Sequence, residues 1–164
     1  RDTSVTGVQT CALPIYSDLN IIAEGPNLAI SVSEKLIEGM DEWNTRHHFG
    51  SGLIDRVRND SVSLEEAERQ TLDFIKQHVP KNTAPLCGNS VWNDRQFLVK
   101  EMPSVTDYLH YRMVDVSTIK ELARRWYPDL PKFEKKAAHA ALDDIRESVF
   151  ELVHFRELLF IDRP

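Results

Sequence analysis

Strand-like and helix-like segments alternate along the middle of this chain, and capping residues or prolines mark the ends of the helices. Ser63 and Glu66 fit a capping box, in which the serine caps the turn while the glutamate reaches back. Apolar positions then follow helical spacing as far as Val79, and Pro80 stops the helix. A short apolar run at 85–90, typical of a buried strand, precedes the next helical pattern. Because strands that alternate with helices pack in layers, the pattern predicts an α/β fold.

The remaining segments extend this alternation. Residues 17–32 are rich in β-branched residues and leucine, with Gly25-Pro26 as punctuation, and are interpreted as strand material, whereas 33–55 mixes short helix signals with loops. Three further helices and a strand are expected: a helix at 93–101, a strand at 109–116, a helix capped by Ser117 or Thr118, and a helix at 140–159. The helix that follows the cap has four residues on one face: Ile119, Leu122, Ala123 and Trp126. The last helix has four residues on its buried face: Ile145, Val149, Leu152 and Val153.

Composition narrows the function classes. The chain has 164 residues, about one domain, with 20 Lys plus Arg against 26 Asp plus Glu. The net charge of −6 argues against coating long nucleic acid by bulk charge, but not against handling short or metal-bridged phosphates. No apolar run reaches the ~18 residues that a membrane span needs. Two cysteines, Cys11 and Cys87, suit a reducing compartment rather than a disulfide scaffold.

The first 16 residues differ in character from the rest. Residues 1–15 are polar, lack strand alternation and helical periodicity, and do not form a signal peptide. Residues 5–15 match the translation of a common sequencing-adapter read. We therefore interpret 1–16 as a foreign leader in place of the true N-terminus, with a genuine disordered tail as the alternative, and 17–164 as the domain.

Three ionisable groups lie where strands or loops are expected to meet helices. Asp94 opens a helix after the strand at 85–90, Asp144 lies in the first turns of the last helix, and His139 precedes it by five residues. Two converging carboxylates can hold a hard cation such as Mg²⁺ or Mn²⁺, and an imidazole can take a proton from water. The set indicates metal-assisted phosphodiester hydrolysis. A lone Asp at a helix start is more often a cap, and spacing alone does not choose between Asp143 and Asp144.

Three stretches carry a resemblance to a known family: 87–98 (CGNSVWNDRQFL), 110–126 (HYRMVDVSTIKELARRW) and 139–148 (HAALDDIRES). Together with 40–44 and 51–53, they are similar to the oligoribonuclease family of the DEDD exonuclease superfamily. The resemblance implies a ribonuclease H-like fold, a mixed central sheet flanked by helices. It also implies a cytoplasmic 3′→5′ exoribonuclease, with relatives in mitochondria, that cuts short RNA oligomers, above all diribonucleotides, with two metal ions.

The resemblance also assigns residues. Asp94 and Asp144, in preference to Asp143, correspond to two of four metal-binding carboxylates, and His139 to the general base. The positions that match a cap around the 5′-phosphate of the substrate are Ser90, Arg112, Ser117 and Thr118. Hydroxyls and an arginine suit a phosphate, although Ser117 and Thr118 fit simple helix caps and Arg112 an ordinary surface charge equally well.

Three further positions follow from the same resemblance. Trp43 and His48 match residues that line the base pocket, where stacking contributes ~1–3 kcal/mol per base; Trp43 as plain core is the alternative. Tyr111 matches a tyrosine that reaches the active site of a second subunit, which implies a homodimer.

The sequence departs from the family at its first motif, Asp-x-Glu on the first strand. No Asp here is followed two residues later by Glu. We therefore expect a missing first strand, low stability and almost no activity. The competing hypotheses are a catalytically inactive module that binds dinucleotides or dimerises, and a proofreading DNA exonuclease, which the matches at Ser90 and Arg112 disfavour.

Overall fold

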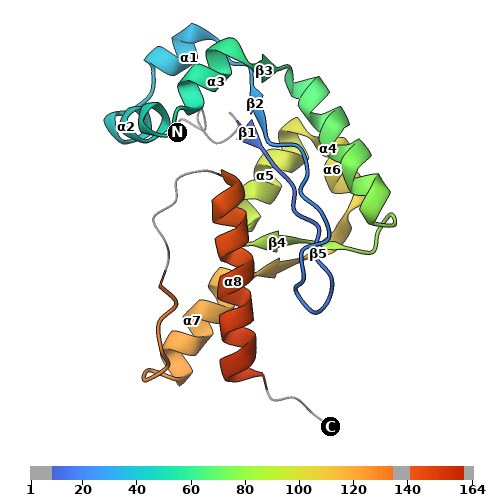
Figure 1. The fold of residues 1–164 in the computed structure, drawn as a ribbon, viewed down its shortest axis with the longest axis vertical. Helices are drawn as coiled ribbons and strands as arrows, with labels where there is room; N and C mark the ends of the chain where they lie inside the picture. The colour runs from blue at the N-terminus through green and yellow to red at the C-terminus, as the bar shows by residue number, and fades with distance from the viewer. Residues whose placement is uncertain (1–8, 135–140, 161–164) are drawn as a thin grey trace.

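The computed structural model describes residues 9–134 and 141–160 and confirms the α/β class. The strands lie in two small sheets flanked by helices, an arrangement consistent with the ribonuclease H-like fold that the resemblance implied. The first contains β1 (Gln9–Thr10), β2 (Leu28–Ile30) and β3 (Ser61–Val62), with β1 antiparallel and β3 parallel to β2. The second pairs β4 (Pro85–Gly88) with β5 (His110–Asp115) in parallel. No backbone ladder joins the two sheets in the described residues, and β2 and β4 lie apart in Figure 1.

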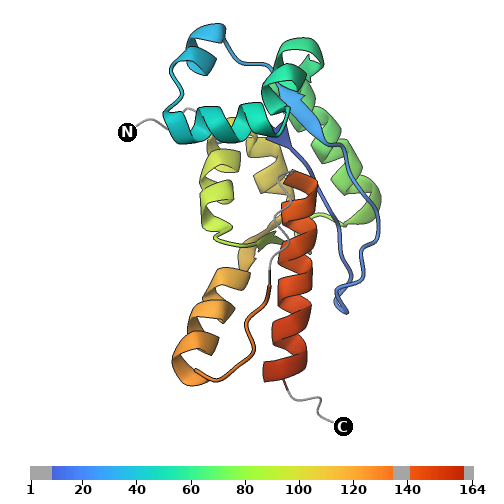
Figure 2. The same ribbon diagram turned by 60° about the vertical axis from the view of Figure 1, so that its left-hand side comes forward.

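Eight helices in the described residues surround these strands (Figures 1 and 2). They are α1 (Glu34–Glu38), α2 (Glu42–Gly50), α3 (Leu53–Asn59), α4 (Leu64–His78), α5 (Trp92–Glu101), α6 (Pro103–Tyr108), α7 (Val116–Trp126) and α8 (Ala141–Leu159). The helices expected from 64, 93, 118 and 140 onward are therefore confirmed. None of those in the described ranges is long and apolar enough to cross a membrane.

The expected strand at 17–32 is mostly wrong. Only Leu28–Ile30 forms a strand, and Ile21 adds an isolated bridge to Ile15. The intervening chain turns through Leu19, whose φ is 73°. At Gly25 an added Cβ would lie 2.6 Å from the ring of Phe74, so this loop packs closely on α4. Apolar composition alone could not distinguish this packed loop from a strand.

Residues 9–16, which lie in the segment interpreted as a leader, have regular backbone pairing. β1 pairs with β2, and the backbone N–H groups of Ile22 and Gly25 donate to the carbonyls of Pro14 and Ala12 at 2.9 and 2.8 Å. Backbone pairing does not need alternating side chains, which explains why the residue pattern gave no sign of it. The foreign origin of the segment stays a prediction.

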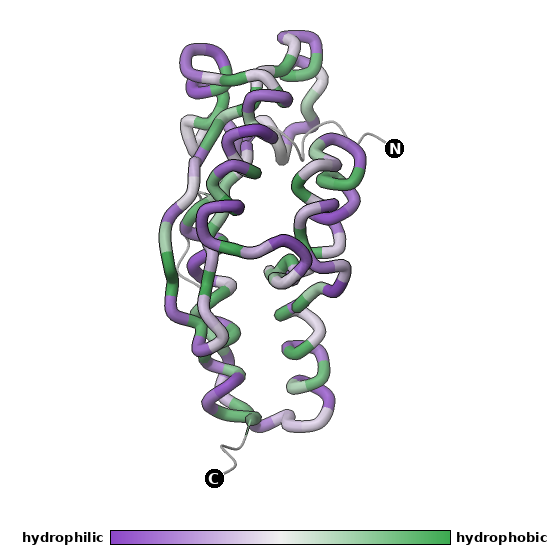
Figure 3. The backbone as a smooth tube through the Cα atoms, turned by 90° about the vertical axis from the view of Figure 1, so that its right-hand side faces the viewer, coloured by the Kyte–Doolittle hydropathy of each residue, from purple (hydrophilic) through white to green (hydrophobic). Residues whose placement is uncertain are grey.

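The core consists of three apolar clusters. One lies between β2 and helices α1 and α3, the second between β2, α4 and α6, and the third between α7 and α8. In Figure 3 hydrophobic and hydrophilic stretches alternate along the tube, as they do in helices with one buried face. On α7 that face holds Val116 and Ala123, whereas Leu122 and Trp126, expected on the same face as Ala123, are 38% and 66% exposed.

Two helix caps differ from their prediction. The Ser63 hydroxyl does accept from the N–H of Glu66 at 3.2 Å, but the Glu66 carboxylate accepts from Arg69 and Gln70 instead of closing a capping box. At α7 the cap is Asp115, which accepts from the N–H of Ser117, and neither Ser117 nor Thr118 fills that position. A cap two residues before Ser117 leaves the Ser117 hydroxyl available for other partners.

Replacing Ser63 with Ala is expected to lower the free energy of unfolding by ~1 kcal/mol, because an N–H in the first turn of α4 loses its acceptor. Urea denaturation measures this. Ser33→Ala is the matched control, since Ser33 precedes α1 without a side-chain cap hydrogen bond. Equal losses in the two variants would contradict the assignment of Ser63 as a cap.

Candidate active site

The ends of the two parallel strands place the predicted phosphate-binding serines together. Gly88 of β4 is in register with Asp115 of β5, so the residues that follow each strand lie at one edge of the sheet. The backbone N–H of Ser90 donates to Asp115 Oδ1 and to Ser117 Oγ, both at 2.9 Å. The hydroxyls of Ser90 and Ser117 are 3.2 Å apart. Ser90, in the loop between β4 and α5, and Ser117, in the first turn of α7, thus form one polar corner.

Ser90 has a left-handed backbone, with a φ of 51°. Such a conformation is unfavourable by ~1–3 kcal/mol outside glycine and persists only where surrounding contacts hold it. Asp115 and Ser117 supply those contacts. These contacts therefore hold the corner in one conformation, with the two hydroxyl oxygens in fixed positions.

Asp115 was not a predicted site residue. Its Oδ1 accepts from the N–H groups of both Ser90 and Ser117, so one carboxylate links the β4–α5 loop to the start of α7. The negative charge of Asp115 also raises the pKa of Asp94. The only sequence signal was an acidic residue at the end of a strand before a helix, which is typical of a cap.

The negative charges of Asp94 and Asp144 both act on the thiol of Cys11. Asp94 lies in the first turn of α5 and Asp144 in the first turn of α8, as predicted. Burial, together with the negative charges of Asp144 and then Asp94, raises the pKa of the Cys11 thiol to about 11. Partial burial also raises the pKa of Asp94, and the charge of Asp115 adds to this effect. Negative charge is thus concentrated around residue 11, just after β1.

Cys11 provides a test of this arrangement. With a pKa of about 11, roughly one thiol in a thousand is ionised at pH 8. Iodoacetamide should therefore label Cys11 slowly, and Asp144→Asn should speed the labelling, because loss of a nearby negative charge lowers the pKa of the thiol. Cys87, whose pKa is raised by burial without a contribution from Asp144, is the internal control in peptide mass spectrometry. An unchanged ratio of the two labelling rates would contradict the placement.

The structure does not bring the other predicted cap residues onto Ser90 and Ser117. Arg112 donates from Nε to the hydroxyl of Tyr111 at 3.2 Å, and its guanidinium lies 5.6 Å from that ring's centre. The side chain of Tyr111 is 70% exposed. Thr118 lies in the first turn of α7 and is exposed.

The remaining predicted residues fall on separate or undescribed parts. His48 lies on α2, which is distant from β4 and β5 in both ribbon views. The side chain of Trp43 and the whole of His139 lie outside the described residues. Their predicted roles stay predictions.

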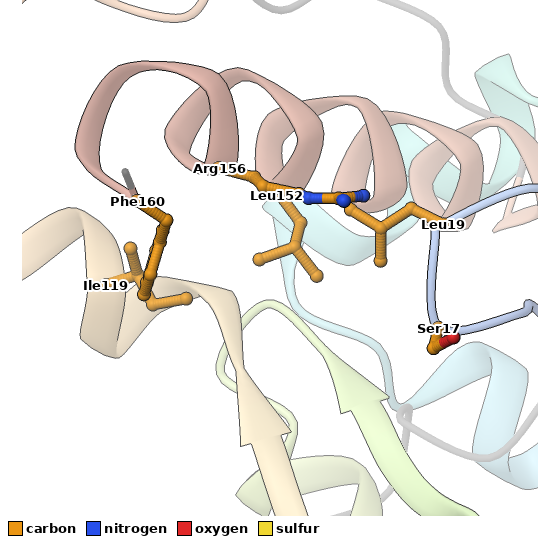
Figure 4. Close-up of a pocket in the computed structure, with 6 residues that line it drawn as sticks. All are labelled: Ser17, Leu19, Ile119, Leu152, Arg156 and Phe160. Atoms are coloured by element: carbon orange, nitrogen blue, oxygen red, sulfur yellow. The ribbon is translucent and has the colours of Figure 1, made fainter. Parts of the chain in front are cut away.

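A pocket of about 270 Å³ lies beside this edge, between the loop at 17–19, α7 and α8 (Figure 4). Its lining is Ser17, Leu19, Ile119, Leu152, Arg156 and Phe160. None of these is a predicted site residue. The close-up shows mostly apolar side chains, so the pocket does not supply the groups that a phosphate needs.

Comparison with known proteins places this sequence among nucleases. The sequence pattern of the exonuclease family matches residues 7–152. The chain is 52% identical to the oligoribonuclease of Pseudomonas fluorescens (strain Pf-5) over 157 residues, which is 95% of this chain and 87% of that protein. It is 56% identical to the oligoribonuclease of Pseudomonas aeruginosa (strain PAO1) over 151 residues, 92% of this chain and 84% of the relative. The oligoribonuclease of Klebsiella pneumoniae is 52% identical over 151 residues, with 92% and 83% covered.

Proposed function

This chain belongs to the exonuclease family, within the oligoribonucleases, and from that premise we propose that it hydrolyses short RNA oligomers, above all diribonucleotides, to mononucleotides. The chain is a 3′→5′ exoribonuclease by family. The observation that carries the substrate proposal is the corner at Ser90 and Ser117, where two hydroxyls lie 3.2 Å apart at a helix start. Hydroxyls and a helix N-terminus favour a terminal phosphate.

A divalent cation, Mg²⁺ or Mn²⁺, would bind at Asp94 and Asp144. Carboxylate oxygens are the ligands that these ions prefer, and a cation would stabilise the ionised form of Asp94, whose pKa is raised by burial and then by the charge of Asp115. The described residues contain no group of three or more His, Cys, Asp or Glu that could hold a metal. Two carboxylates would hold one ion, whereas the family mechanism uses two. When bound, the cation supplies Lewis-acid activation of the phosphodiester and of the attacking water.

The chain's own residues would bind and orient the substrate. Ser90 and Ser117 would form the subsite for the 5′-phosphate, with Ser90 as the hydroxyl donor and Ser117 as the residue that orients it, and Thr118 and Arg112 would turn toward the phosphate when substrate is present. Trp43 and His48 would stack on the bases. His139 would take the proton from the attacking water.

We expect little turnover from the chain with this sequence. No Asp-x-Glu motif is present, so two of the family's four carboxylates have no counterpart. The separation of the strands into two sheets agrees with a missing strand between them. Foreign residues at 1–16 remain our explanation for both features.

The exposure of Tyr111 supports the proposed homodimer. A tyrosine that is 70% exposed on β5 is available to enter a second subunit's site. The proposed location is the cytoplasm, in keeping with a family that completes RNA decay.

The proposal is tested by incubating the chain with a 5′-phosphorylated diribonucleotide and Mn²⁺, while binding is followed by calorimetry and products by chromatography. Measurable binding with only trace turnover is the expected result. Absence of binding would contradict the assigned substrate. Rapid turnover that Asp144→Asn abolishes would show that other residues supply the missing carboxylates, against our interpretation of residues 1–16.

A further inference from the structure

A buried carboxylate on α8 has no part in the chemistry described above. The side chain of Glu151 is 3% exposed, although it carries a charge. Its Oε1 accepts from Lys120 Nζ at 2.8 Å, and its Oε2 accepts from Asn89 Nδ2 at 2.9 Å. Burying a carboxylate is unfavourable unless it is paired and hydrogen-bonded. A pair of apolar residues would fill the same space between α7 and α8 without this cost. The presence of Glu151 and Lys120 there therefore needs an explanation.

Asn89 connects this carboxylate to the corner at Ser90. Its Nδ2 donates to Ser148 Oγ at 3.0 Å as well as to Glu151, and both acceptors are on α8. Its Oδ1 accepts from Ser117 Oγ at 3.1 Å. Because the amide nitrogen must face α8, the amide oxygen must face Ser117. The orientation of Asn89 is therefore fixed by Glu151 and Ser148.

The fixed amide determines what the two serine hydroxyls can do. The Ser117 hydroxyl directs its proton to Asn89 and accepts from the backbone N–H of Ser90. The Ser90 hydroxyl, 3.2 Å away, is then the donor of that pair. Its proton can turn from Ser117 to an incoming anion, because the side chain of Ser90 is exposed. Without the Asn89 acceptor, the Ser117 proton could point at Ser90 and oppose this arrangement.

We propose that Glu151 is a positioning residue for the 5′-phosphate subsite: through Asn89 it sets the direction of the Ser117 and Ser90 hydroxyls, and so the preference for a terminal phosphate. The inference rests on the proposed function and adds to it a residue that no substrate atom touches. Lys120 neutralises the buried carboxylate, and α8 carries the same network toward Asp144, since Ser148 donates to the Asp144 carbonyl at 3.0 Å.

The test measures the affinity of the full chain for a diribonucleotide with a 5′-phosphate and for the same compound with a 5′-hydroxyl, by calorimetry in EDTA. The native chain is expected to prefer the phosphate by about tenfold or more, as charge-assisted hydrogen bonds predict. Glu151→Leu fills the buried space but leaves Asn89 only the Ser148 hydroxyl as an acceptor on α8, and should reduce the preference to about threefold or less. Glu151→Gln keeps an acceptor toward Asn89, while the half-exposed Lys120 turns to solvent, and should retain most of the preference.

Glu147→Leu is the matched control. Glu147 is also buried, one turn earlier on α8, and its Oε1 has no hydrogen-bond partner, so its loss should leave the phosphate preference unchanged. Asn89→Ala removes the link while keeping the Glu151–Lys120 pair, and should act like Glu151→Leu, which keeps the test decisive if the leucine variant does not fold. An unchanged preference for the 5′-phosphate in both Glu151→Leu and Asn89→Ala would overturn the inference. Absence of any preference in the native chain would instead contradict the proposed phosphate subsite itself.

Discussion

Replacing residues 1–16 with the family's Asp-x-Glu strand is expected to raise the rate of diribonucleotide hydrolysis by about a thousandfold. The physical reason is the ligand count. Asp94 and Asp144 together offer two carboxylates, and the described residues assemble no larger metal-binding group. Two further carboxylates would allow a second cation, which stabilises the charge that develops on the leaving oxygen.

The same replacement with Asn-x-Gln in the strand is the control, because it restores the backbone without the charges. We expect it to raise the melting temperature but not the rate. Equal rates for the original, the restored and the amide-bearing chains would contradict our account of the first motif.

Asp144→Asn in the restored chain is expected to lower the turnover number by about a thousandfold, and Asp94→Asn by a similar factor. An amide keeps the shape of the side chain but loses the negative charge that, in our proposal, would hold the cation. Steady-state kinetics in Mn²⁺ measure the effect, and circular dichroism checks that the variants are folded.

Asp143→Asn is the matched control for this prediction. Asp143 is the neighbouring carboxylate and pairs with Arg146 at 3.3 Å on the surface, where such pairs contribute little. We expect less than about a twofold change in its rate. A large loss at Asp143 with a small one at Asp144 would reverse the assignment that the family resemblance made.

Local signals predicted the helices and strands near the site well. The proline after Val79 and the capping serine fixed α4 to within a residue, and the apolar run before Ser117 predicted β5. The interval 17–32 was misread because its apolar residues pack a loop against α4 instead of pairing along a sheet. Composition records that a residue is buried, but not whether its backbone is paired.

The site was only partly accessible from sequence. Ser90 and Ser117 came from the family resemblance, and the structure brings them together. Asp115, Asn89 and Glu151 were not predicted, because their roles depend on contacts between loops and helices 25 to 62 residues apart. A buried glutamate in particular looks in the sequence like any exposed charge on an amphipathic helix.

The most direct test of the central claim is a competition in one tube between a 5′-phosphorylated diribonucleotide and a longer RNA, cut by the restored chain in Mn²⁺. Chromatography at successive times gives both rates. We predict that the diribonucleotide is converted to mononucleotides while most of the longer RNA remains. Equal consumption of both, or an intact diribonucleotide at the end, would contradict the assignment of this chain as an exoribonuclease for the shortest RNA oligomers.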